Sequence, residues 1–361
     1  MPLPSVCFLW FFAFLVANSA RLISRRTAFQ KTLRGWYRRQ ARPLPWREDP
    51  SLYKTVVSEF MLQQTQVKTV LPYFARWLAV LPDFAALAAA PGAQLLKLWE
   101  GLGYYARARN LHRLARAIAA LPAPPRTPAA WRELPGVGPY TAAAITSITF
   151  GAPVAVVDGN VVRILARLTA DGLTFRDGSA AAQAFTPLAQ ALLSAASPGD
   201  HNQAMMELGA TVCLRQNPRC PECPVAAFCA ARRSGSPEKY PRLAPKIIEQ
   251  VAVTRLWCER TGRLLLHRTD TAARRLAGLH ELPTPEQLGL VEADAVAGGL
   301  LARRSRSITK YRITESIYRG PIRPGGRRAG LVWVPVAALG AVTLSGPHRR
   351  WIREILAGSK P

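Results

Sequence analysis

The sequence predicts a mainly α-helical region followed by a smaller α+β domain, and three observations lead to this. From about residue 28 to residue 231, apolar residues recur three and four positions apart, with Pro or Gly breaks between the runs. Residues 232–247 are rich in Pro, Ser and charge, as linkers often are. After this linker, residues 251–267 alternate around Thr261-Gly262, which favours a hairpin. Two further runs predict strands, over residues 308–318 and 331–336.

Residues 1–27 are expected to form a leader outside the folded part. Within them, residues 6–17 are all apolar, a run shorter than the roughly 20 residues that span a membrane. The run resembles the apolar core of a signal peptide, but no Lys or Arg precedes it. We therefore favour a disordered leader or a start codon assigned too far upstream, and we expect a cytoplasmic protein with no membrane partner.

The charge balance predicts a polyanionic partner. The chain of 361 residues has 48 Lys and Arg against 22 Asp and Glu, which gives a net charge of +26. Residues 248–361 hold 19 basic and 9 acidic residues, and the part before them holds 29 and 13. An acidic small molecule needs only one basic pocket, whereas this excess extends over both regions. Nucleic acid is the default partner of such a chain.

Four of the six cysteines fall within 17 residues and indicate a metal centre. Their spacing is Cys-x6-Cys-x2-Cys-x5-Cys, formed by Cys213, Cys220, Cys223 and Cys229. Zinc sites usually combine two pairs of ligands separated by a longer loop, so one tight run favours an iron–sulfur cluster, although the spacing is not that of ferredoxins. The alternative is a buried thiol or two with coincidental neighbours. The arginines around the run suit a loop that grips phosphate.

A glycine-flanked turn, Gly136-Val137-Gly138, precedes a predicted helix. Such a turn exposes backbone N–H groups at a helix N-terminus, where a phosphate oxygen binds. A helix–turn–helix in any bundle can have the same pattern. In a chain this basic we favour a helix-hairpin-helix whose backbone positions DNA without reading its bases.

Two acidic positions are candidates for catalysis. Glu59 lies on a predicted helix, with Gln63 one turn further on the same face. It is either a solvated side chain or a partly buried acid whose raised pKa lets it deliver a proton. Asp158 and Asn160 precede a helical stretch, and an Asp or Asn in that place most often caps the helix, so the pattern leaves their function open.

Polar and aromatic residues elsewhere in the helical region suit contacts with bases. Gln63 and Gln64 belong to an uncharged hydrogen-bonding run. Tyr104 follows a glycine-containing turn and either wedges into a base stack or packs in the core. Trp46 and Arg47 place a stacking surface beside a cation, although tryptophan is more often a core residue.

Together these motifs resemble the helix-hairpin-helix base-excision glycosylases and, within them, the adenine DNA glycosylases of the MutY type. The resemblance is dense over about residues 36–229 and weaker beyond. It rests on the four-cysteine loop and on the segments SEFMLQQTQV, GLGYYARARN, LPGVGPYTAAAI, VDGNVVRILAR and NQAMMELG. It implies two helical lobes, one of which holds a 4Fe-4S cluster, with the active site between them. The implied substrate is double-stranded DNA with adenine mispaired with 8-oxoguanine or guanine, and the adenine is flipped out before its N-glycosidic bond is cleaved.

The resemblance also implies roles for individual residues. Glu59 corresponds to the acid that protonates adenine N7, and Asp158 to the carboxylate that stabilises the sugar cation, as in the two-carboxylate chemistry of glycoside cleavage. Endonuclease III-like relatives have a Schiff-base lysine where this chain has Tyr140, so a glycosylase without lyase activity is implied. Tyr140 and Asn160 correspond to hydrogen-bonding partners in the pocket. Trp46, Arg47 and Glu207 correspond to pocket residues around the flipped base. Gln64 and Tyr104 correspond to residues inserted into the duplex.

The C-terminal domain resembles the Nudix-like recognition domain of the same family. Residues 276–283 (LAGLHELP) resemble the entry to a Nudix motif, but no carboxylate cluster follows that would hold Mg²⁺. Recognition of the oxidised guanine is therefore the implied role. The family's Phe-Ser-His tip corresponds here to Ile308-Thr309-Lys310. Thr309 retains a hydroxyl, whereas Lys310 cannot accept a hydrogen bond as histidine can, so discrimination between 8-oxoguanine and guanine is expected to differ.

We therefore expect a monomeric adenine-specific DNA glycosylase of base excision repair that acts on the nucleoid in the cytoplasm. Two alternatives remain. An endonuclease III-like glycosylase for oxidised pyrimidines is disfavoured by Tyr140 and by the added domain. A DNA-damage binder or iron–sulfur redox sensor without catalysis predicts DNA binding with no release of a base.

Overall fold

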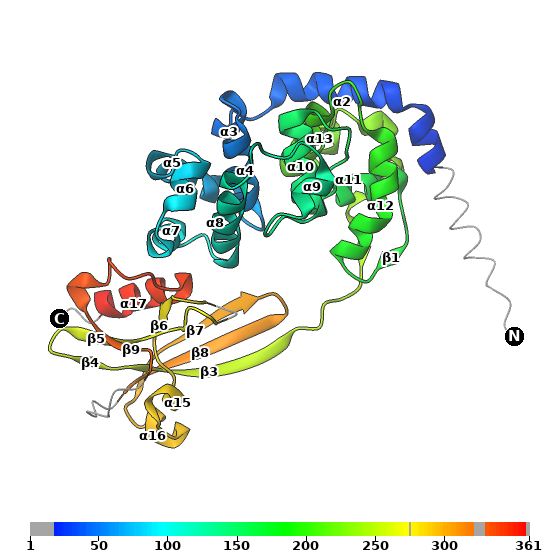
Figure 1. The fold of residues 1–361 in the computed structure, drawn as a ribbon. Coiled ribbons are helices and arrows are strands. Elements are labelled where there is room, and N and C mark those ends of the chain that lie inside the picture. The colour runs from blue at the N-terminus through cyan, green and yellow to red at the C-terminus, as the bar shows by residue number, and fades with distance from the viewer. Residues whose placement is uncertain (1–17, 274–275, 321–328, 359–361) are drawn as a thin grey trace, which may run out of the picture. The chain divides into compact units, whose positions relative to one another are not determined.

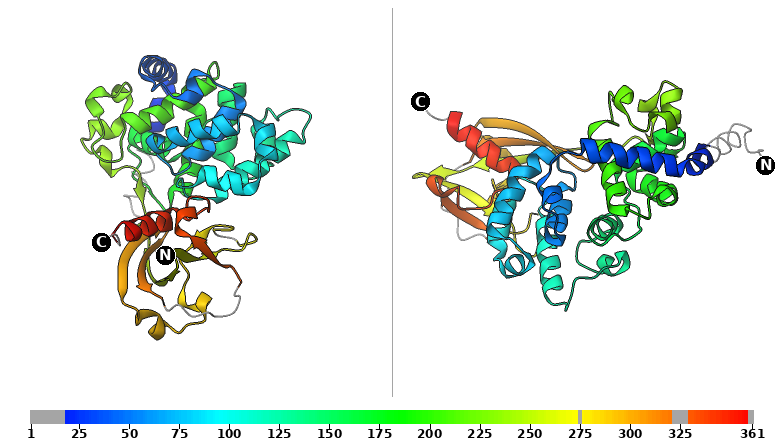
Figure 2. Two further views of the ribbon diagram at one scale, coloured as in Figure 1. Left: turned by 90° about the vertical axis from the view of Figure 1, so that its left-hand side faces the viewer. Right: turned by 90° about the horizontal axis from the view of Figure 1, so that it is seen from above.

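The computed structural model describes residues 18–273, 276–320 and 329–358. These residues form two compact units, and each unit draws on two separate parts of the chain. Figures 1 and 2 show the helices and strands that make them up. The first unit comprises the chain up to Gln63 together with Ala120–Pro245, and the second comprises Gln64–Ala119 together with Lys246–Pro361. This division differs from the sequence expectation of one helical region over residues 28–231, because residues 64–119 pack with the C-terminal domain.

The first unit is helical and has one main core. Within it, α11 buries Val161, Ile164, Leu165 and Leu168 against its neighbours, the spacing of an amphipathic helix. Its α-helices are α2 (Arg26–Gln40), α3 (Pro45–Glu48), α4 (Leu52–Leu62), α9 (Pro128–Arg132), α10 (Pro139–Phe150), α11 (Gly159–Thr169), α12 (Gly178–Leu192), α13 (Pro198–Thr211) and α14 (Ala230–Arg233).

The folded part begins earlier than the sequence predicts. Residues 18–24 are helical, and Leu22 lies in the core of the first unit. The side-chain amide of Asn18 donates a hydrogen bond to the carbonyl of Thr169 at 3.0 Å. The expected leader boundary at residue 27 is therefore wrong for residues 18–27, because one apolar side chain in this segment completes the core. The apolar run at residues 6–17 lies outside the described residues, and none of the described helices is long and apolar enough to cross a membrane.

The segment expected to be a linker is partly folded onto the first unit. A two-residue strand, β2 (Arg242–Leu243), pairs in parallel with β1 (Thr174–Phe175), which was not predicted. The guanidinium of Arg167 donates to the carbonyls of Pro237 at 2.9 Å and Tyr240 at 3.3 Å. These long-range hydrogen bonds hold much of residues 232–247 in place, and composition alone does not reveal them.

The helices of the second unit pack around buried tryptophans. The rings of Trp77 and Trp99 meet edge to face with their centroids 5.5 Å apart, and both side chains are fully buried. This pair joins α5 (Val67–Val80) to α7 (Gly92–Trp99). The other helices of this part of the unit are α6 (Phe84–Ala89) and α8 (Ala106–Ala119).

The C-terminal part of the second unit contains two small sheets. In the first, β8 (Tyr311–Arg319) lies between β3 (Glu249–Trp257), which runs parallel to it, and β7 (Leu300–Ile308), which runs antiparallel. The second sheet is antiparallel, and its strands are β4 (Glu259–Arg260), β5 (Arg263–Arg268), β6 (His280–Glu281) and β9 (Leu331–Pro335). Short helices α15 (Pro285–Leu288) and α16 (Glu292–Val296) follow β6. Helix α17 (Gly346–Gly358) buries Trp351, Ile352 and Ile355 in the core.

The sequence predicted one turn of this domain correctly and missed another. Thr261 and Gly262 join β4 to β5 with φ of 43° and 68°, as a two-residue hairpin turn requires. The strand expected over residues 308–318 is wrong at its start. β7 ends at Ile308, and Thr309, with φ of 54°, begins the turn into β8. A β-branched residue rarely adopts this conformation, so local propensity did not mark the turn.

Candidate active site

A buried carboxyl group, that of Glu59, lies at the centre of the first unit. Ser51 caps helix α4 by accepting a hydrogen bond from the backbone N–H of Lys54 at 3.1 Å. The helix is buried on nearly every side, and Glu59 is only 6% exposed. Burial, and after it the nearby charge of Asp158, raise the pKa of Glu59, whereas a hydrogen bond from Tyr140 and the charge of Arg47 lower it, and together these effects place it at about 7. Glu59 is therefore buried and not solvated, and its role as a proton donor stays a prediction.

Tyr140 is brought to Glu59 by the turn that begins α10. Its hydroxyl hydrogen bonds to the Glu59 carboxyl group and lies 3.4 Å from Sδ of Met206. Burial raises the pKa of Tyr140 well above its ordinary value, so the phenol stays neutral. A neutral phenol can donate to a carboxylate and accept from a carboxylic acid, so it serves Glu59 in either protonation state.

Asp158 caps α11 and also lies near Glu59. Its carboxylate accepts hydrogen bonds from the backbone N–H of Val161 at 2.7 Å and from Nδ2 of Asn160 at 2.9 Å. Burial raises the pKa of Asp158, and these donors together with Arg163 lower it. The capping role therefore does not exclude a chemical one, because the same hydrogen bonds fix the carboxylate in place and favour its charged form.

Asn160 is held by close packing and by an arginine. Its Oδ1 accepts from Nη2 of Arg163 at 2.8 Å. The same nitrogen donates to the carbonyl of Gly209 on α13, also at 2.8 Å. A Cβ added at Gly209 would lie 2.5 Å from Cβ of Asn160, so only glycine lets α13 approach this closely.

Glu207 binds two arginines. Oε1 accepts from Nε of Arg42 at 2.6 Å, and Oε2 accepts from Nη2 of Arg42 and Nη1 of Arg47, both at 2.9 Å. The Glu207 side chain is fully buried. Burial alone would raise its pKa, but the two arginines lower it, and the pKa ends below its ordinary value. A carboxylate engaged in this way positions Arg47. Arg42, which sequence reasoning missed, completes the group.

Trp46 and Gln63 lie in the same unit. Trp46 belongs to the short helix α3 and is 9% exposed, so most of its ring is packed in the interior. Gln63 ends α4, and its Nε2 lies 3.4 Å from Oγ1 of Thr141, the residue next to Tyr140. The first unit thus brings together Glu59, Tyr140, Asp158, Asn160, Arg47 and Glu207, while their roles stay predictions.

The turn before α10 has the geometry of a hairpin between two helices. Gly136 has φ of 76°, and Gly138 is the N-cap residue of α10 with Pro139 in its first turn. No heavy atom lies within 4 Å of a Cβ placed on Gly138, so this backbone is open to a partner. Val137, between them, is buried.

The four cysteines are free thiols around two short 3-10 turns, η1 (Cys220–Glu222) and η2 (Ala226–Phe228). Nη1 of Arg167 donates to Sγ of Cys213 at 3.3 Å, and the backbone carbonyl oxygen of Arg167 lies 3.4 Å from the thiol of Cys229. The pKa of Cys223 is raised to about 12, mainly by burial and in part by the charges of the other three cysteines. The four thiols therefore lie near one another. Among the described residues, however, no group of three or more His, Cys, Asp or Glu side chains has the arrangement of a metal site. The donor set fits a thiolate-bound centre, and the side chains are not gathered into ligand geometry.

Gln64 and Tyr104 lie in the second unit, and both have left-handed backbone conformations. Their φ values are 56° and 47°, and Tyr104 is 47% exposed. Arg107, which is buried, connects their two loops: Nη2 contacts Oγ1 of Thr65 at 3.1 Å and the carbonyl of Gly103 at 3.2 Å. Non-glycine residues in this region are uncommon and cluster at functional sites. Sequence reasoning missed that Arg107 organises both loops.

Thr309 and Lys310 form the turn between β7 and β8. The hydroxyl of Thr309 donates to the carbonyl of Ile308 at 2.7 Å, and the ammonium of Lys310 pairs with Glu249 at 2.5 Å. Both side chains are exposed. The turn is therefore an accessible tip, and Glu249 is a charged neighbour that the sequence did not suggest.

Comparison with known proteins agrees with the motifs. Residues 57–174 match the family described as HhH-GPD superfamily base excision DNA repair protein. The human adenine DNA glycosylase is 45% identical over 224 residues, which cover 59% of this chain and 41% of the relative. That of Schizosaccharomyces pombe is 40% identical over 240 residues (59% and 52%), and that of Buchnera aphidicola subsp. Baizongia pistaciae is 36% identical over 208 residues (56% and 57%). The chain thus spans about half the length of these relatives, and the predicted resemblance is confirmed.

Solved structures show the same helical fold. A thermostable thymine-DNA glycosylase is 26% identical, with a TM-score of 0.51, and the match covers 58% of this chain and 98% of that one. A non-covalent endonuclease III–DNA complex is 20% identical, with a TM-score of 0.50, and covers 59% and 97%. The helical part of the chain therefore has the fold of HhH-GPD repair proteins.

The buried acid predicts a pH-dependent cost in stability. A carboxyl group with a raised folded-state pKa favours the folded state below pH 4.5, and this contribution is lost as the pH rises through about 7. Glu59→Gln, which stays neutral, is expected to raise the free energy of unfolding at pH 8 by about 2–3 kcal/mol. At pH 4.5 the variant and the unaltered protein should be nearly equal. Urea unfolding at the two pH values measures this.

Glu133→Gln is the matched control, because Glu133 is exposed in the same unit. It should change stability little at either pH. A Glu59→Gln variant that is less stable than the unaltered protein at pH 8 would show that the ionised carboxylate is a favoured form.

Proposed function

We propose that this chain, whose helical region is similar to adenine DNA glycosylases, removes adenine mispaired with 8-oxoguanine or guanine from double-stranded DNA. The reaction is hydrolysis of the N-glycosidic bond. The observation that carries the proposal is the pair formed by Glu59, a buried acid with a pKa of about 7, and Asp158, a carboxylate anchored by two donors. Two carboxyl groups with different environments are what glycoside cleavage requires.

Glu59 is the proton donor of this mechanism. Adenine leaves poorly as an anion, and protonation at N7 makes it a neutral leaving group. A carboxyl group with a pKa near 7 is protonated in a large fraction of molecules at neutral pH and still gives up its proton readily. Tyr140 keeps the carboxyl group oriented toward a base that has been flipped out of the duplex.

Asp158 acts on the sugar. Loss of adenine leaves an oxocarbenium-like cation at C1′, and a nearby carboxylate stabilises it, either by its charge or by a transient covalent bond that water then opens. Asn160 and the N-terminal turn of α11 hold the carboxylate. Because they are preorganised, they need not rearrange as positive charge develops.

Arg47, Glu207 and Trp46 form the side of the pocket. Glu207 fixes the guanidinium of Arg47, and Arg47 in turn lowers the pKa of Glu59, so this group adjusts the acid as well as surrounding the base. Because position 140 is a tyrosine, no lysine stands ready there to form a Schiff base with the sugar. The enzyme is therefore monofunctional and leaves an intact strand with an abasic site.

DNA is gripped by the backbone and recognised from both strands. The open turn Gly136–Gly138 binds phosphate without base readout. Gln64 and Tyr104 enter the duplex where adenine leaves. Thr309 and Lys310, at the exposed tip of a Nudix-like C-terminal domain, meet the opposite base. The enzyme acts as a monomer on DNA in the cytoplasm.

The cysteine loop holds a 4Fe-4S cluster in this proposal. Cys213, Cys220, Cys223 and Cys229 supply four thiolates, and free thiols on one loop are the donor set of such a centre. A bound cluster would supply a rigid, charged scaffold for the loop. Arg163 and Arg167 of α11 connect that loop to the helix that Asp158 caps. The cluster takes no part in breaking the glycosidic bond.

The main test is release of adenine in single turnover. Labelled duplexes with A:8-oxoguanine, A:G or thymine glycol are incubated with excess iron-replete protein, and strand breaks are scored before and after hot alkali. We expect breaks in the two adenine duplexes only, and only after alkali. Glu59→Gln should bind the same DNA yet release adenine at least about 100-fold more slowly, because general acid catalysis is lost. Glu133→Gln should react at the normal rate.

The alternatives give different outcomes in this assay. Cleavage of thymine-glycol DNA, or breaks without alkali, would favour an endonuclease III-like enzyme. Tight binding of every duplex with no base released would favour a non-catalytic DNA-damage binder. Near-normal release by Glu59→Gln would refute the acid assignment.

The cluster has a separate test. Protein purified without oxygen should be brown, contain iron and acid-labile sulfide in equal amounts, and lose its broad visible absorption on iron chelation. Cys223→Ser should lose the colour. Cys258→Ser, which changes a buried cysteine of the C-terminal domain, should keep it. A colourless, iron-free protein with full adenine release would contradict the assignment.

A further inference from the structure

A buried ion pair joins the α7–α8 segment to the start of helix α17 within the second unit. The Glu100 side chain is 4% exposed, and its Oε1 accepts from Nε of Arg349 at 2.8 Å. Its Oε2 lies 2.7 Å from Nη2 of Arg349, so the two groups meet side by side. The backbone N–H of Leu344 also donates to Oε1 at 2.7 Å. The carboxylate is thus almost enclosed by groups of the C-terminal domain.

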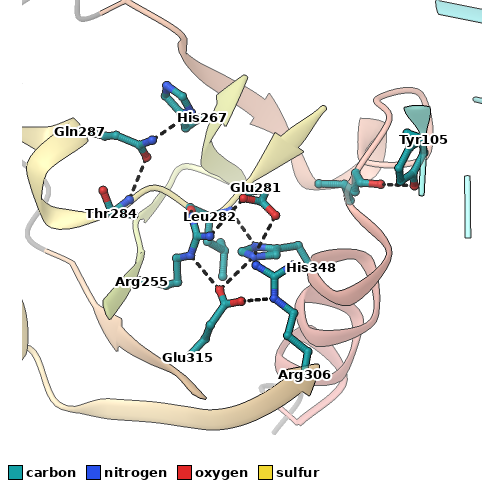
Figure 3. A network of polar contacts seen from close by, with 11 residues as sticks. Tyr105, Arg255, His267, Glu281, Leu282, Thr284, Gln287, Arg306, Glu315 and His348 are labelled. Carbon is teal, nitrogen blue, oxygen red and sulfur yellow. Dashed lines mark hydrogen bonds and ion pairs between the residues drawn. The ribbon is translucent and has the colours of Figure 1, made fainter. Parts of the chain in front are cut away.

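The neighbours of Glu100 on the helical side hold the same segment. The hydroxyl of Tyr105 (Figure 3) donates to the carbonyl of Leu344 at 3.1 Å. The ammonium of Lys97 donates to the carbonyl of Val342 at 3.0 Å. Both backbone polar groups of Leu344 are therefore bound by α7–α8 side chains. We call this set, namely Lys97, Glu100, Tyr105, Leu344 and Arg349, the junction.

One side of the junction leads to the loop that carries Tyr104. Gly101 follows Glu100 directly with φ of 107°, and a Cβ there would lie 2.0 Å from the hydroxyl of Tyr73. That hydroxyl donates to the carbonyl of Glu100 at 2.9 Å. The indole N–H of Trp99 donates to the carbonyl of Gly103 at 3.1 Å. The loop is thus fixed at its backbone, while the ring of Tyr104 is half exposed.

The other side leads to the sheet whose tip carries Thr309 and Lys310. His348, next to Arg349 on α17, is fully buried, accepts at Nδ1 from the N–H of Leu282 at 2.9 Å, and meets Oε2 of Glu315 through Nε2 at 3.2 Å. Glu315 on β8 also binds Arg306 on β7 at 2.5 Å (Figure 3). Arg306 and Glu315 thus connect the two strands that lead to the tip.

We propose that Glu100 is a positioning residue that, through Arg349 and Leu344, fixes the Tyr104 loop relative to the C-terminal domain. Insertion of Tyr104 beside the target adenine then depends on the same rigid unit that presents Thr309 and Lys310. This inference rests on the proposed function. It adds that Tyr104 and the C-terminal domain, which is expected to recognise the opposite base, move as one body.

Physical reasoning supports a strong effect from so few atoms. Removing Arg349 leaves a buried carboxylate that keeps only Lys97 and one N–H, and a buried pair that loses one partner is strongly destabilised. Positioning errors of about 1 Å cost about 100-fold in rate when reacting groups must be aligned. The loop that carries Tyr104 begins directly after Glu100, so we expect its position to change when the ion pair is lost.

The test combines Arg349→Met with Tyr104→Ala. Single-turnover adenine release from A:8-oxoguanine DNA is measured, together with the fluorescence of 2-aminopurine placed beside the target adenine, which reports unstacking on binding. Arg349→Met is expected to slow release about tenfold and to reduce the fluorescence rise. The double variant should be no slower than Tyr104→Ala alone, because both changes act on one step. Arg349→Lys should recover part of the rate.

The controls separate positioning from folding and from DNA affinity. Arg350→Met removes the neighbouring arginine, which is exposed and lies 3.8 Å from Glu354, and should keep the normal rate under saturating protein. Glu100→Gln keeps the acceptor for Leu344 and loses the ion pair, so it serves if Arg349→Met does not fold. Normal release and fluorescence in both junction variants, or rate losses that multiply in the double variant, would overturn the proposal. If the unaltered protein releases no adenine, the proposed function fails, while the fluorescence readout, which needs only binding, still tests the junction.

Discussion

The burial of one carboxyl group is the constraint on which the rest of the catalytic account depends. In water Glu59 would be ionised at neutral pH, and an ionised glutamate has no proton to give a leaving base. Packing α4 on nearly every side raises its pKa to about 7, and the charge of Asp158 acts in the same direction. Arg47 and Tyr140 limit the rise, and Arg47 can do so only because Glu207 holds it. The pKa of Glu59 is therefore set by residues from four separate helices.

Helix α11 connects the chemistry to the cysteine loop. Asp158 caps its N-terminus, Asn160 lies in its first turn, and Arg163 donates from the next turn to the carbonyl of Cys213 at 2.8 Å. One turn later Arg167, almost fully buried, reaches the sulfur of Cys213. If a bound group fixes the shape of the cysteine loop, these hydrogen bonds would fix the loop relative to α11, which holds the carboxylate of Asp158. Under the proposed function, this arrangement would let a bound centre help to order the site without taking part in the reaction.

The sequence predicted those features that depend on a few adjacent residues. The helix cap at Asp158, the glycine turn before α10 and the Thr261-Gly262 hairpin each depend on a few adjacent residues. The partners that complete the site come from far along the chain, so no period or spacing marks them: Arg42 meets Glu207 across 165 positions, and Glu100 meets Arg349 across 249. Family resemblance supplied the residues that we propose to contact DNA or the base. The arginines that hold those residues in place became visible only in the folded chain.

The most direct measurement of the central claim is the pH dependence of adenine release by the unaltered protein. Single-turnover rates on A:8-oxoguanine DNA, taken with saturating protein between pH 5 and pH 9, isolate the chemical step. If Glu59 donates the proton, the rate must fall above pH 7, approaching about tenfold per pH unit, because only the protonated form reacts. A rate that stays constant or rises from pH 7 to pH 9 would contradict proton delivery by this buried carboxyl group.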